Sequence, residues 1–356
     1  NGTQLNATAS VPRTFSYSPR SGTLLPAGEG TLSVTFTPTD TANYDTVTAT
    51  NTITVNKATP NVLIEGAGTW AYSAMPHAVV GKVKDRFNIV IATPTVTYDG
   101  SPDPPMLPGT YTVVATFPGN ANYLAGTATE TLTITKSVVS MQLFVQDAVY
   151  DGASHGAGYL INGFDDDFFP ADGLTYNGSE NPPVNVGTYT VVLTFNGTAL
   201  YEAATLSRTF TIHKATPTVS VTGGTFTYDA TAHPATGTVM RGAVSLGSPV
   251  FTYNGASEAP VDGGTYNIVG TYAGDANHNA ASGSGTITIN KAVPTVTVAG
   301  GAYIYDGQPH PATGTVTGIG GVQLTGLTFT YNASSEPPVN AGAYAVTGTY
   351  PGNTDY

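Results

Sequence analysis

Apolar and polar residues alternate in short stretches along the whole chain. Residues 112–117 are typical: they read Thr-Val-Val-Ala-Thr-Phe and lead into a turn rich in Pro, Gly and Asn. Other stretches close a segment with alternating apolar residues, namely Leu132 and Ile134, Phe210 and Ile212, and Ile287 and Ile289. Alternation with period two predicts β-strands that bury one face. No sustained helical period occurs, so strands are expected throughout.

Three markers return every 77–79 residues. The first is a lysine that opens each segment, at Lys57, Lys136, Lys214 and Lys291. The second is a Tyr-Asp-Gly-like triplet followed by a histidine, with its tyrosine at Tyr72, Tyr150, Tyr228 and Tyr305 and its histidine at His77, His155, His233 and His310. The third, residues 176–189, returns at 253–266 and 331–344 and in a diverged form at 98–111. A fixed period of this kind indicates tandem repeats of one structural unit.

The repeat length sets the predicted fold. About 78 residues with six or seven short strands suit a small antiparallel, immunoglobulin-like β-sandwich. We therefore predict an all-β tandem array that forms an elongated rod, because only Lys-Ala-Thr-Pro or a close variant joins one unit to the next and proline restricts the backbone there. The expected boundaries are a partial immunoglobulin-like repeat at 1–56, full repeats at 57–135, 136–213 and 214–290, and a repeat lacking its last strand at 291–356. Residues 262–266 also suggest a tyrosine corner, in which the Tyr266 hydroxyl bonds to nearby backbone.

Several of these motifs resemble a known family. Residues 214–217 (Lys-Ala-Thr-Pro), 227–229 (Thr-Tyr-Asp), 232–234 (Ala-His-Pro) and 264–266 (Gly-Thr-Tyr), in that order, resemble the mostly-beta glycine-rich (MBG, or YDG-type) repeats of large bacterial surface and secreted proteins. The resemblance runs from about Lys57 to Tyr356, and residues 1–56 resemble a related bacterial immunoglobulin-like repeat. It implies an extracellular or cell-surface location and an adhesin-like or scaffold role, without a catalytic residue to carry over.

Composition narrows the partners and the chemistry. Charged residues make up 10% of the 356 residues, and the formal net charge of −12 would repel nucleic acid and anionic membrane surfaces. The chain has no cysteine, so disulfides and thiolate metal sites do not contribute to its stability. No apolar run is long enough to cross a bilayer, so no membrane insertion is expected in this segment.

The repeated polar residues do not form a predicted active site. Each marker histidine belongs to a different repeat, and strands of six to ten residues are about 20 to 33 Å long, so histidines one repeat apart cannot share a metal ion. Glu180, Glu258 and Glu336 lie in proline-rich turns rather than in a cleft. We therefore expect no enzyme activity and no cofactor.

An acidic loop in the second full repeat is the candidate metal site. Asp165, Asp166, Asp167 and Asp172 lie within eight residues, and calcium prefers oxygen ligands of this kind. The spacing is not that of an EF-hand, and a solvated acidic loop is the competing interpretation.

Aromatic side chains outside the repeat pattern offer a second function. Trp70, Phe164, Phe168 and Phe169 are candidates for stacking on sugars, whereas the tyrosines recur at fixed positions, as framework packing predicts. The predicted function is a structural spacer or adhesive stalk of a bacterial surface protein, and the alternative is a carbohydrate- or surface-binding module. Expected partners are neighbouring repeats of the same chain, with other copies in a fibre or surface glycans as further candidates.

Two questions concern the junctions and the ends. The junction lysines could form Lys–Asn amides, but exposed strand-end lysines that discourage edge pairing explain them as well. From Tyr44, Tyr123, Tyr201 and His278 to the next junction lysine is always 13 residues, and Tyr356 holds the same turn position. We expect a segment cut from a longer array, with a strand supplied by a second chain as the alternative.

Overall fold

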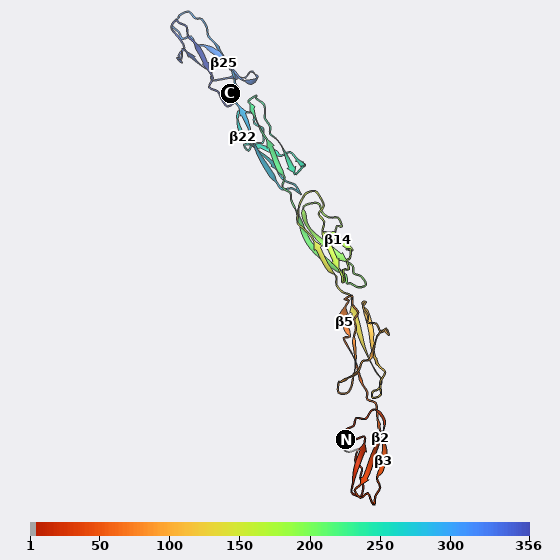
Figure 1. Ribbon diagram of the computed structural model, residues 1–356. Helices are drawn as coiled ribbons and strands as arrows, with labels where there is room; N and C mark the ends of the chain where they lie inside the picture. The colour runs from red at the N-terminus through yellow and green to blue at the C-terminus, as the bar shows by residue number, and fades with distance from the viewer. Residues whose placement is uncertain (1–4) are drawn as a thin grey trace. The chain divides into compact units, whose positions relative to one another are not determined.

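The computed structural model describes residues 5–356 and is built almost entirely of β-strands in small, separate sheets, which Figure 1 traces along the chain. The predicted all-β repeat array is confirmed. The chain divides into two compact units, Asn1–Phe144 with Gly158–Leu174 and Val192–Ser207, and Val145–Ala157 with Thr175–Val191 and Arg208–Tyr356. Within residues 5–356, no helix has the length and apolar character that a membrane span requires.

The first domain is one antiparallel sheet with the strand order β1-β2-β3. Its strands are β1 (Arg13–Ser18), β2 (Gly28–Pro38) and β3 (Val47–Val55). Residues 1–4 of the predicted 1–56 domain lie outside the described residues.

Each of the four repeats holds two sheets, and the second sheet has four strands in each of the first three repeats but two strands in the fourth. The first repeat has sheets β4-β6-β7 and β5-β10-β9-β8, and the second has β11-β13 and β12-β16-β15-β14. The third has β17-β19-β20 and β18-β23-β22-β21, and the fourth has β24-β25-β26 and β27-β28. The bounds in the first two repeats are β4 (Asn61–Glu65), β5 (Gly68–Ala71), β6 (Val80–Lys84), β7 (Val90–Ala92), β8 (Thr95–Tyr98), β9 (Gly109–Phe117), β10 (Gly126–Thr135), β11 (Ser140–Phe144), β12 (Ala148–Val149), β13 (Gly158–Asn162), β14 (Gly173–Tyr176), β15 (Gly187–Phe195) and β16 (Ala204–His213). Those in the last two are β17 (Thr218–Thr222), β18 (Gly224–Thr227), β19 (Thr236–Arg241), β20 (Val244–Gly247), β21 (Val250–Tyr253), β22 (Gly264–Tyr272), β23 (Ala281–Asn290), β24 (Thr295–Ala299), β25 (Thr313–Thr317), the 3-10 helix η1 (Ile319–Gly321), β26 (Gln323–Leu324), β27 (Thr328–Tyr331) and β28 (Val346–Thr349).

One pairing in each of the first three repeats departs from the antiparallel prediction. The closing strands β10, β16 and β23 pair in parallel with the short strands β5, β12 and β18. A closing strand such as β23 also pairs antiparallel with β22, so it lies between two neighbours. Alternation along a strand fixes which face is buried but not the direction of the partner, which is why the sequence did not indicate the parallel pair.

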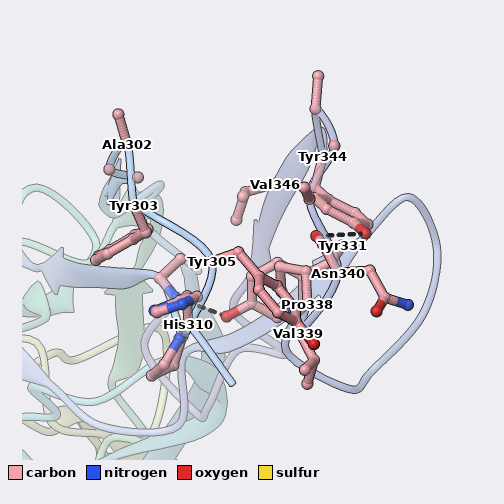
Figure 2. A pocket seen from close by; sticks show the side chains of 17 residues that line it. Ala302, Tyr303, Tyr305, His310, Tyr331, Pro338, Val339, Asn340, Tyr344 and Val346 are labelled. Carbon is pink, nitrogen blue, oxygen red and sulfur yellow. Dashed lines mark hydrogen bonds between the residues drawn. The ribbon is translucent and has the colours of Figure 1, made fainter. Parts of the chain in front are cut away.

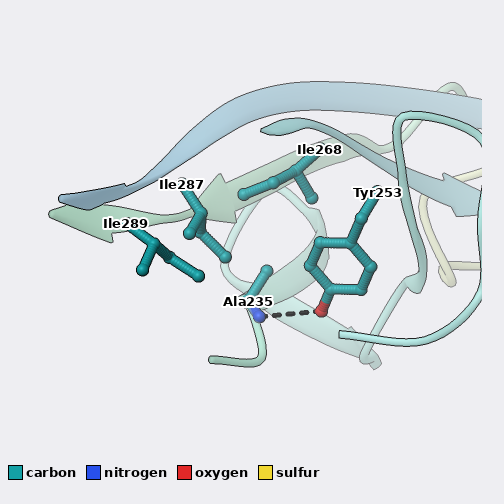
Figure 3. Packing of buried hydrophobic residues seen from close by; sticks show 5 residues of the cluster. All are labelled: Ala235, Tyr253, Ile268, Ile287 and Ile289. Atoms are coloured by element: carbon teal, nitrogen blue, oxygen red, sulfur yellow. Dashed lines mark hydrogen bonds between the residues drawn. The ribbon is translucent and has the colours of Figure 1, made fainter. Parts of the chain in front are cut away.

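In the first three repeats the core is built on the closing strand. In the third repeat Ile287 and Ile289 pack with Ala235, Tyr253 and Ile268, as Figure 3 shows. Both isoleucines are almost fully buried, as the alternation predicted. Each buried isoleucine stabilises the fold by about 1.5–3 kcal/mol, so the closing strand contributes much of a small core.

A tight turn fixes the hairpin that leads into the third marker. In the second repeat Asn177 and Gly178 have φ of 49° and 87°, and Tyr176 pairs with Ser179 across the turn. Positive φ at both central residues defines the type I′ hairpin turn, for which Asn-Gly is the preferred sequence. Asn177 Oδ1 also accepts the Thr190 amide at 2.8 Å.

The predicted tyrosine corner is present in every repeat. The Tyr266 hydroxyl donates to the Asp262 carbonyl at 3.0 Å, and its counterparts Tyr111, Tyr189 and Tyr344 make the same bond to the residue four positions earlier. A second tyrosine lies in the core, where the Tyr253 hydroxyl accepts the Ala235 amide at 2.8 Å. The repeated tyrosines therefore hold the framework together.

Candidate functional site

Three of the four marker histidines stack on an aromatic ring within their own repeat. His77 lies 5.9 Å from Trp70, His233 lies 4.2 Å from Phe226, and His310 lies 4.4 Å from Tyr303, measured between ring centroids, with interplanar angles of 28°, 18° and 12°. In the second repeat Ala148 holds the place of the aromatic ring. The backbone N–H of each histidine donates to a proline carbonyl of the third marker, as from His233 to Pro260 at 3.0 Å.

The aspartate of the Tyr-Asp-Gly triplet faces the same histidine. His155 Nε2 lies 3.1 Å from Asp151 Oδ1, and His233 Nε2 lies 3.2 Å from Asp229 Oδ1. The latter contact has ion-pair distance but not hydrogen-bond geometry, so His233 Nε2 has no hydrogen-bond partner. The backbone N–H of Ala153, then the nearby His155, hold the pKa of Asp151 below its ordinary value. The aspartate therefore serves first to order its own turn.

Trp70 is part of this recurring stack. Its side chain is 49% exposed, and its Nε1 donates to the Gly66 carbonyl at 3.3 Å. Because Phe226 and Tyr303 occupy the same place in later repeats, Trp70 has a framework contact as well as an exposed face. The position of Trp70 holds Trp, Ala, Phe and Tyr in the four successive repeats, so the sequence pattern did not indicate this stack. Its signal was an aromatic residue two places before the marker tyrosine.

The three phenylalanines of the acidic-loop segment do not share one exposed surface. Phe169 packs against Phe195 and Tyr201, with ring centroids 5.2 and 5.3 Å away. Phe164 stacks on Tyr201, and Phe168 is 62% exposed. Only Phe164 and Phe168 of the three present a large exposed fraction to a ligand.

The acidic loop directs its carboxylates to separate partners. Asp165 and Asp166 have φ of 51° and 60° and form the turn, while Asp167 Oδ2 accepts the Tyr201 hydroxyl at 3.3 Å. Asp172 Oδ2 accepts the Asn196 amide at 2.7 Å. In the part of the chain that the structure describes, no three acidic or histidine side chains gather as a metal site would require. Calcium binding by these four aspartates stays a prediction without a geometric argument for it.

Two junction lysines bind backbone carbonyls of a turn in their own repeat. Lys214 Nζ donates to the Asp275 carbonyl at 2.6 Å, and Lys291 Nζ donates to the carbonyls of Asn353 and Tyr356. These ammonium groups face main-chain oxygens, whereas an amide crosslink needs an asparagine side chain as partner. The lysines thus tie the start of a repeat to its turn.

A cavity of about 470 Å³ lies in the fourth repeat and is shown in Figure 2. Its walls include Gly301, Tyr303, His310, Tyr331 and Tyr344. In the third repeat the segments that correspond to 301–304 and 342–344 flank β23, in the registers Gly224↔Ile287 and Gly264↔Ile289. The walls of the cavity therefore correspond to segments that pair with the closing strand in the third repeat, and the cavity alone does not argue for a small-molecule site.

The chain belongs to the MBG domain family. The model of that domain matches it four times, at residues 90–138, 141–216, 217–293 and 294–354, which confirms the resemblance of the repeats. The domain boundaries predicted from the sequence stay predictions.

Other comparisons add little. No curated protein matches the chain. Among solved structures, one match is the M60 catalytic domain with the CBM51-1 and CBM51-2 domains of Clostridium perfringens ZmpB, at 11% identity and a TM-score of 0.17, covering 85% of this chain and 43% of that one. Another is BT4661, a SusE-like surface located polysaccharide binding protein from the Bacteroides thetaiotaomicron heparin utilisation locus, at 10% identity and a TM-score of 0.15, covering 78% of this chain and 54% of that one. The chain spans about half the length of these structures or less.

Proposed function

We propose that this chain is a non-catalytic segment of an extracellular bacterial surface protein and acts there as a spacer or adhesive stalk. The observation that carries the proposal is the use of the recurring polar side chains inside the repeats. The tyrosine-corner hydroxyls bond to backbone carbonyls, and each marker histidine faces an aspartate or serine of its own repeat, with three of the four also stacked on an aromatic ring. What recurs along the chain is a scaffold rather than a reaction centre.

The composition supports an exposed, passive role. A net charge of −12 with 10% charged residues leaves hydroxyl and amide groups to keep the surface hydrated. Stability without cysteine suits a chain whose repeats each have their own small core. Neighbouring repeats are its first partners, and other copies in a fibre or surface glycans are further partners in this proposal.

Solution scattering of the full chain tests the spacer. Five domains of about 30–35 Å placed end to end give a radius of gyration of about 45 Å, whereas a compact 356-residue protein would give about 20 Å. We expect a value near the larger figure and a pair-distance distribution with a long tail. A value close to that of a compact particle would contradict the spacer role.

Glycan binding is the second candidate, because Trp70 and Phe168 keep 49% and 62% of their side chains exposed. A glycan array probed with the full chain would detect it. If binding uses the tryptophan face, Trp70→Ala abolishes the signal, and Phe226→Ala, which removes the equivalent stack in the third repeat, leaves it unchanged. An array without any signal would favour the spacer.

A further inference from the structure

Successive repeats meet through a pair of aromatic rings. Tyr72 lies edge-on to Tyr201 at 5.8 Å, Tyr150 to His278 at 5.2 Å, and Tyr228 to Tyr356 at 5.2 Å, with interplanar angles of 88°, 88° and 77°. The first ring of each pair is the marker tyrosine of one repeat, and the second belongs to a turn of the next repeat. Each contact lies inside one compact unit. We name them the Tyr72, Tyr150 and Tyr228 joints.

The second ring of each joint is anchored at the start of its own repeat. Tyr201 forms a parallel bridge with Ser137, and His278 forms one with Ala215, each next to the junction lysine. Tyr201 and His278 are 1% and 5% exposed. The turn and the junction therefore form one rigid end, against which the preceding repeat packs.

A hydrogen bond accompanies the rings. In the Tyr150 joint the Val186 amide donates to Asn277 Oδ1 at 3.0 Å, and in the Tyr228 joint the Gly263 amide donates to Asp355 Oδ1 at 2.8 Å. The donor always precedes the glycine of a tyrosine corner, and the acceptor always precedes the aromatic turn residue. A side chain at Gly263 would clash with the backbone carbonyl of Thr354, so the two repeats approach closely there.

The first domain is held by the same kind of bond. Its Ala27 amide donates to Asn122 Oδ1 at 2.9 Å, although this domain has no marker tyrosine. Asn122 precedes Tyr123, the turn aromatic residue of the first repeat. The hydrogen bond therefore recurs even where the ring pair does not.

The Tyr72 joint lacks both the donor and the acceptor of this hydrogen bond. The position equivalent to Val186 is Pro108, which has no N–H, and the position equivalent to Asn277 is Leu200, which has no acceptor. Changing one partner alone would leave a polar group unpaired, which costs more than replacing both. Phe164 provides apolar contact there instead, with its ring 6.3 Å from Tyr72 and 6.4 Å from Tyr201.

The residue that faces the turn ring differs between joints, according to whether that ring is tyrosine or histidine. Gly163 and Gly318 face Tyr201 and Tyr356, and a Cβ at either glycine would clash with the tyrosine. The following amides, of Phe164 and Ile319, donate to the two tyrosine hydroxyls at 2.8 Å.

In the Tyr150 joint the smaller His278 is matched by a larger neighbour. Arg241 stands at the position of these glycines, and its guanidinium lies 5.2 Å from the Tyr150 ring centroid. Arg241 Nη1 donates to the Asp151 carbonyl at 2.7 Å. The arginine therefore joins the third repeat to the second with a cation–π contact and a hydrogen bond.

We propose that the repeat ends are a matched interface whose partner is the turn end of another repeat of this family. One side presents the marker tyrosine and the backbone amide of the residue before the corner glycine, unless that residue is proline. The other presents an aromatic turn residue preceded by Asn or Asp, or by an apolar residue when the amide is absent. This inference goes beyond the proposed function, because such joints would order neighbouring repeats in a spacer and in a binding array alike.

The absence of native cysteine allows a direct test on the full chain. Nitroxide labels on cysteines replacing the exposed Thr190 and Ser284 report the distance between the second and third repeats by double electron–electron resonance. We expect a narrow distance distribution for the otherwise unchanged chain and at least about a twofold broadening for Tyr150→Leu combined with Asn277→Leu. Tyr72→Leu, the same change at another joint, should leave the width unchanged. Equal widths in all three proteins would overturn the proposal.

A gain of interaction keeps the proposal falsifiable if the leucine variants lose their fold. Pro108→Ala and Leu200→Asn together restore a donor and an acceptor at the Tyr72 joint. Hydrogen exchange of the backbone amide that Pro108→Ala introduces is expected to be at least about fivefold slower in the double variant than in the single variant. Equal exchange in the single and double variants would show that the two positions do not meet, and the pairing would be wrong.

Discussion

The Tyr72 and Tyr150 joints solve one packing problem with different chemistry. At the Tyr72 joint the contacts are apolar, with Phe164 beside the rings and Tyr201 as the turn residue. At the Tyr150 joint His278 and Arg241 bring polar groups to the same place. The difference shows that the residues of a joint change as a set, because each is complementary to a group on the facing repeat or on its own turn.

The two joints also differ in how the aromatic turn residue is held by its own repeat. Tyr201 is enclosed by its own repeat, with a hydroxyl that bonds to the Phe164 amide and to Asp167. His278 is held from one side, where Nδ1 lies 2.9 Å from both carboxylate oxygens of Asp275. An apolar joint therefore depends on close packing, and a polar joint depends on charge.

The largest expected effect comes from filling the space beside Tyr201. Gly163→Ala places a Cβ against the Tyr201 ring, which must move or be strained, and overpacking of this kind costs about 1–3 kcal/mol. We expect faster hydrogen exchange in peptides that contain Phe164 and Tyr201. Gly173→Ala is the matched control in the same repeat, because its Cβ would meet Thr194 at an ordinary 3.6 Å. Identical exchange in the two variants would contradict the tight fit.

The pH dependence of the joints is expected to have opposite signs. A hydrogen bond from the His278 imidazole holds the pKa of Asp275 below its ordinary value, so its stabilising effect is complete above about pH 5 and is lost as the pH falls through the lowered pKa. Burial raises the pKa of Tyr201, so the effect of its neutral hydroxyl is complete below about pH 9 and is lost as the pH rises through the raised pKa.

Label pairs across each joint measure this contrast. Residues 190 and 284 report the Tyr150 joint, and the exposed Thr116 and Thr205 serve for the Tyr72 joint. Acid should broaden only the first distance distribution, and alkali should broaden the second more than the first. A response of both joints at the same end of the pH range would refute the assignment of their chemistry.

The smallest effect is expected from Arg241. In Arg241→Gln two contacts are removed, the cation–π contact with Tyr150, worth about 0.5–1 kcal/mol at a partly exposed site, and the guanidinium hydrogen bond to the Asp151 carbonyl. The distance between labels at 190 and 284 should broaden slightly, and addition of salt should have less influence than in the unchanged chain. Arg208→Gln, at an exposed position of β16, provides the control for a loss of charge alone. A loss of stability at the Tyr150 joint larger than the loss that Gly163→Ala causes at the Tyr72 joint would contradict this ranking.

The sequence pattern predicted the strands and their buried faces because these depend on local order. Ile287 and Ile289 alternate with polar residues, and that alternation specifies one face of a strand. The Asp-x-Gly-x-Tyr spacing likewise located the corner at Tyr266, since its hydrogen bond closes over four residues. The sequence-based predictions were correct where the interacting residues lie close together in the chain.

Contacts between distant residues escaped that reasoning. Val186 and Asn277 are 91 residues apart and lie in different repeats, so the period alone does not pair them. The place of Phe169 between Phe195 and Tyr201 is also a tertiary contact, and as a sequence feature it resembled an exposed aromatic cluster. The stack of Trp70 on His77 uses a position that holds Trp, Ala, Phe or Tyr in the four repeats, so no single residue type recurs there.

The type I′ turns bear on how the protein ages. Asn-Gly sequences lose ammonia when the glycine nitrogen attacks the asparagine side chain, which must first swing towards it. Asn177 is restrained from that motion, because its side chain accepts the Thr190 amide at 2.8 Å and donates to the Thr188 carbonyl at 3.2 Å. The first repeat carries Asp99 at this position, and its carboxylate accepts the Thr112 amide at 2.7 Å. The turn thus restrains the side chain that deamidation requires to move, and the first repeat shows that the same turn also forms with aspartate.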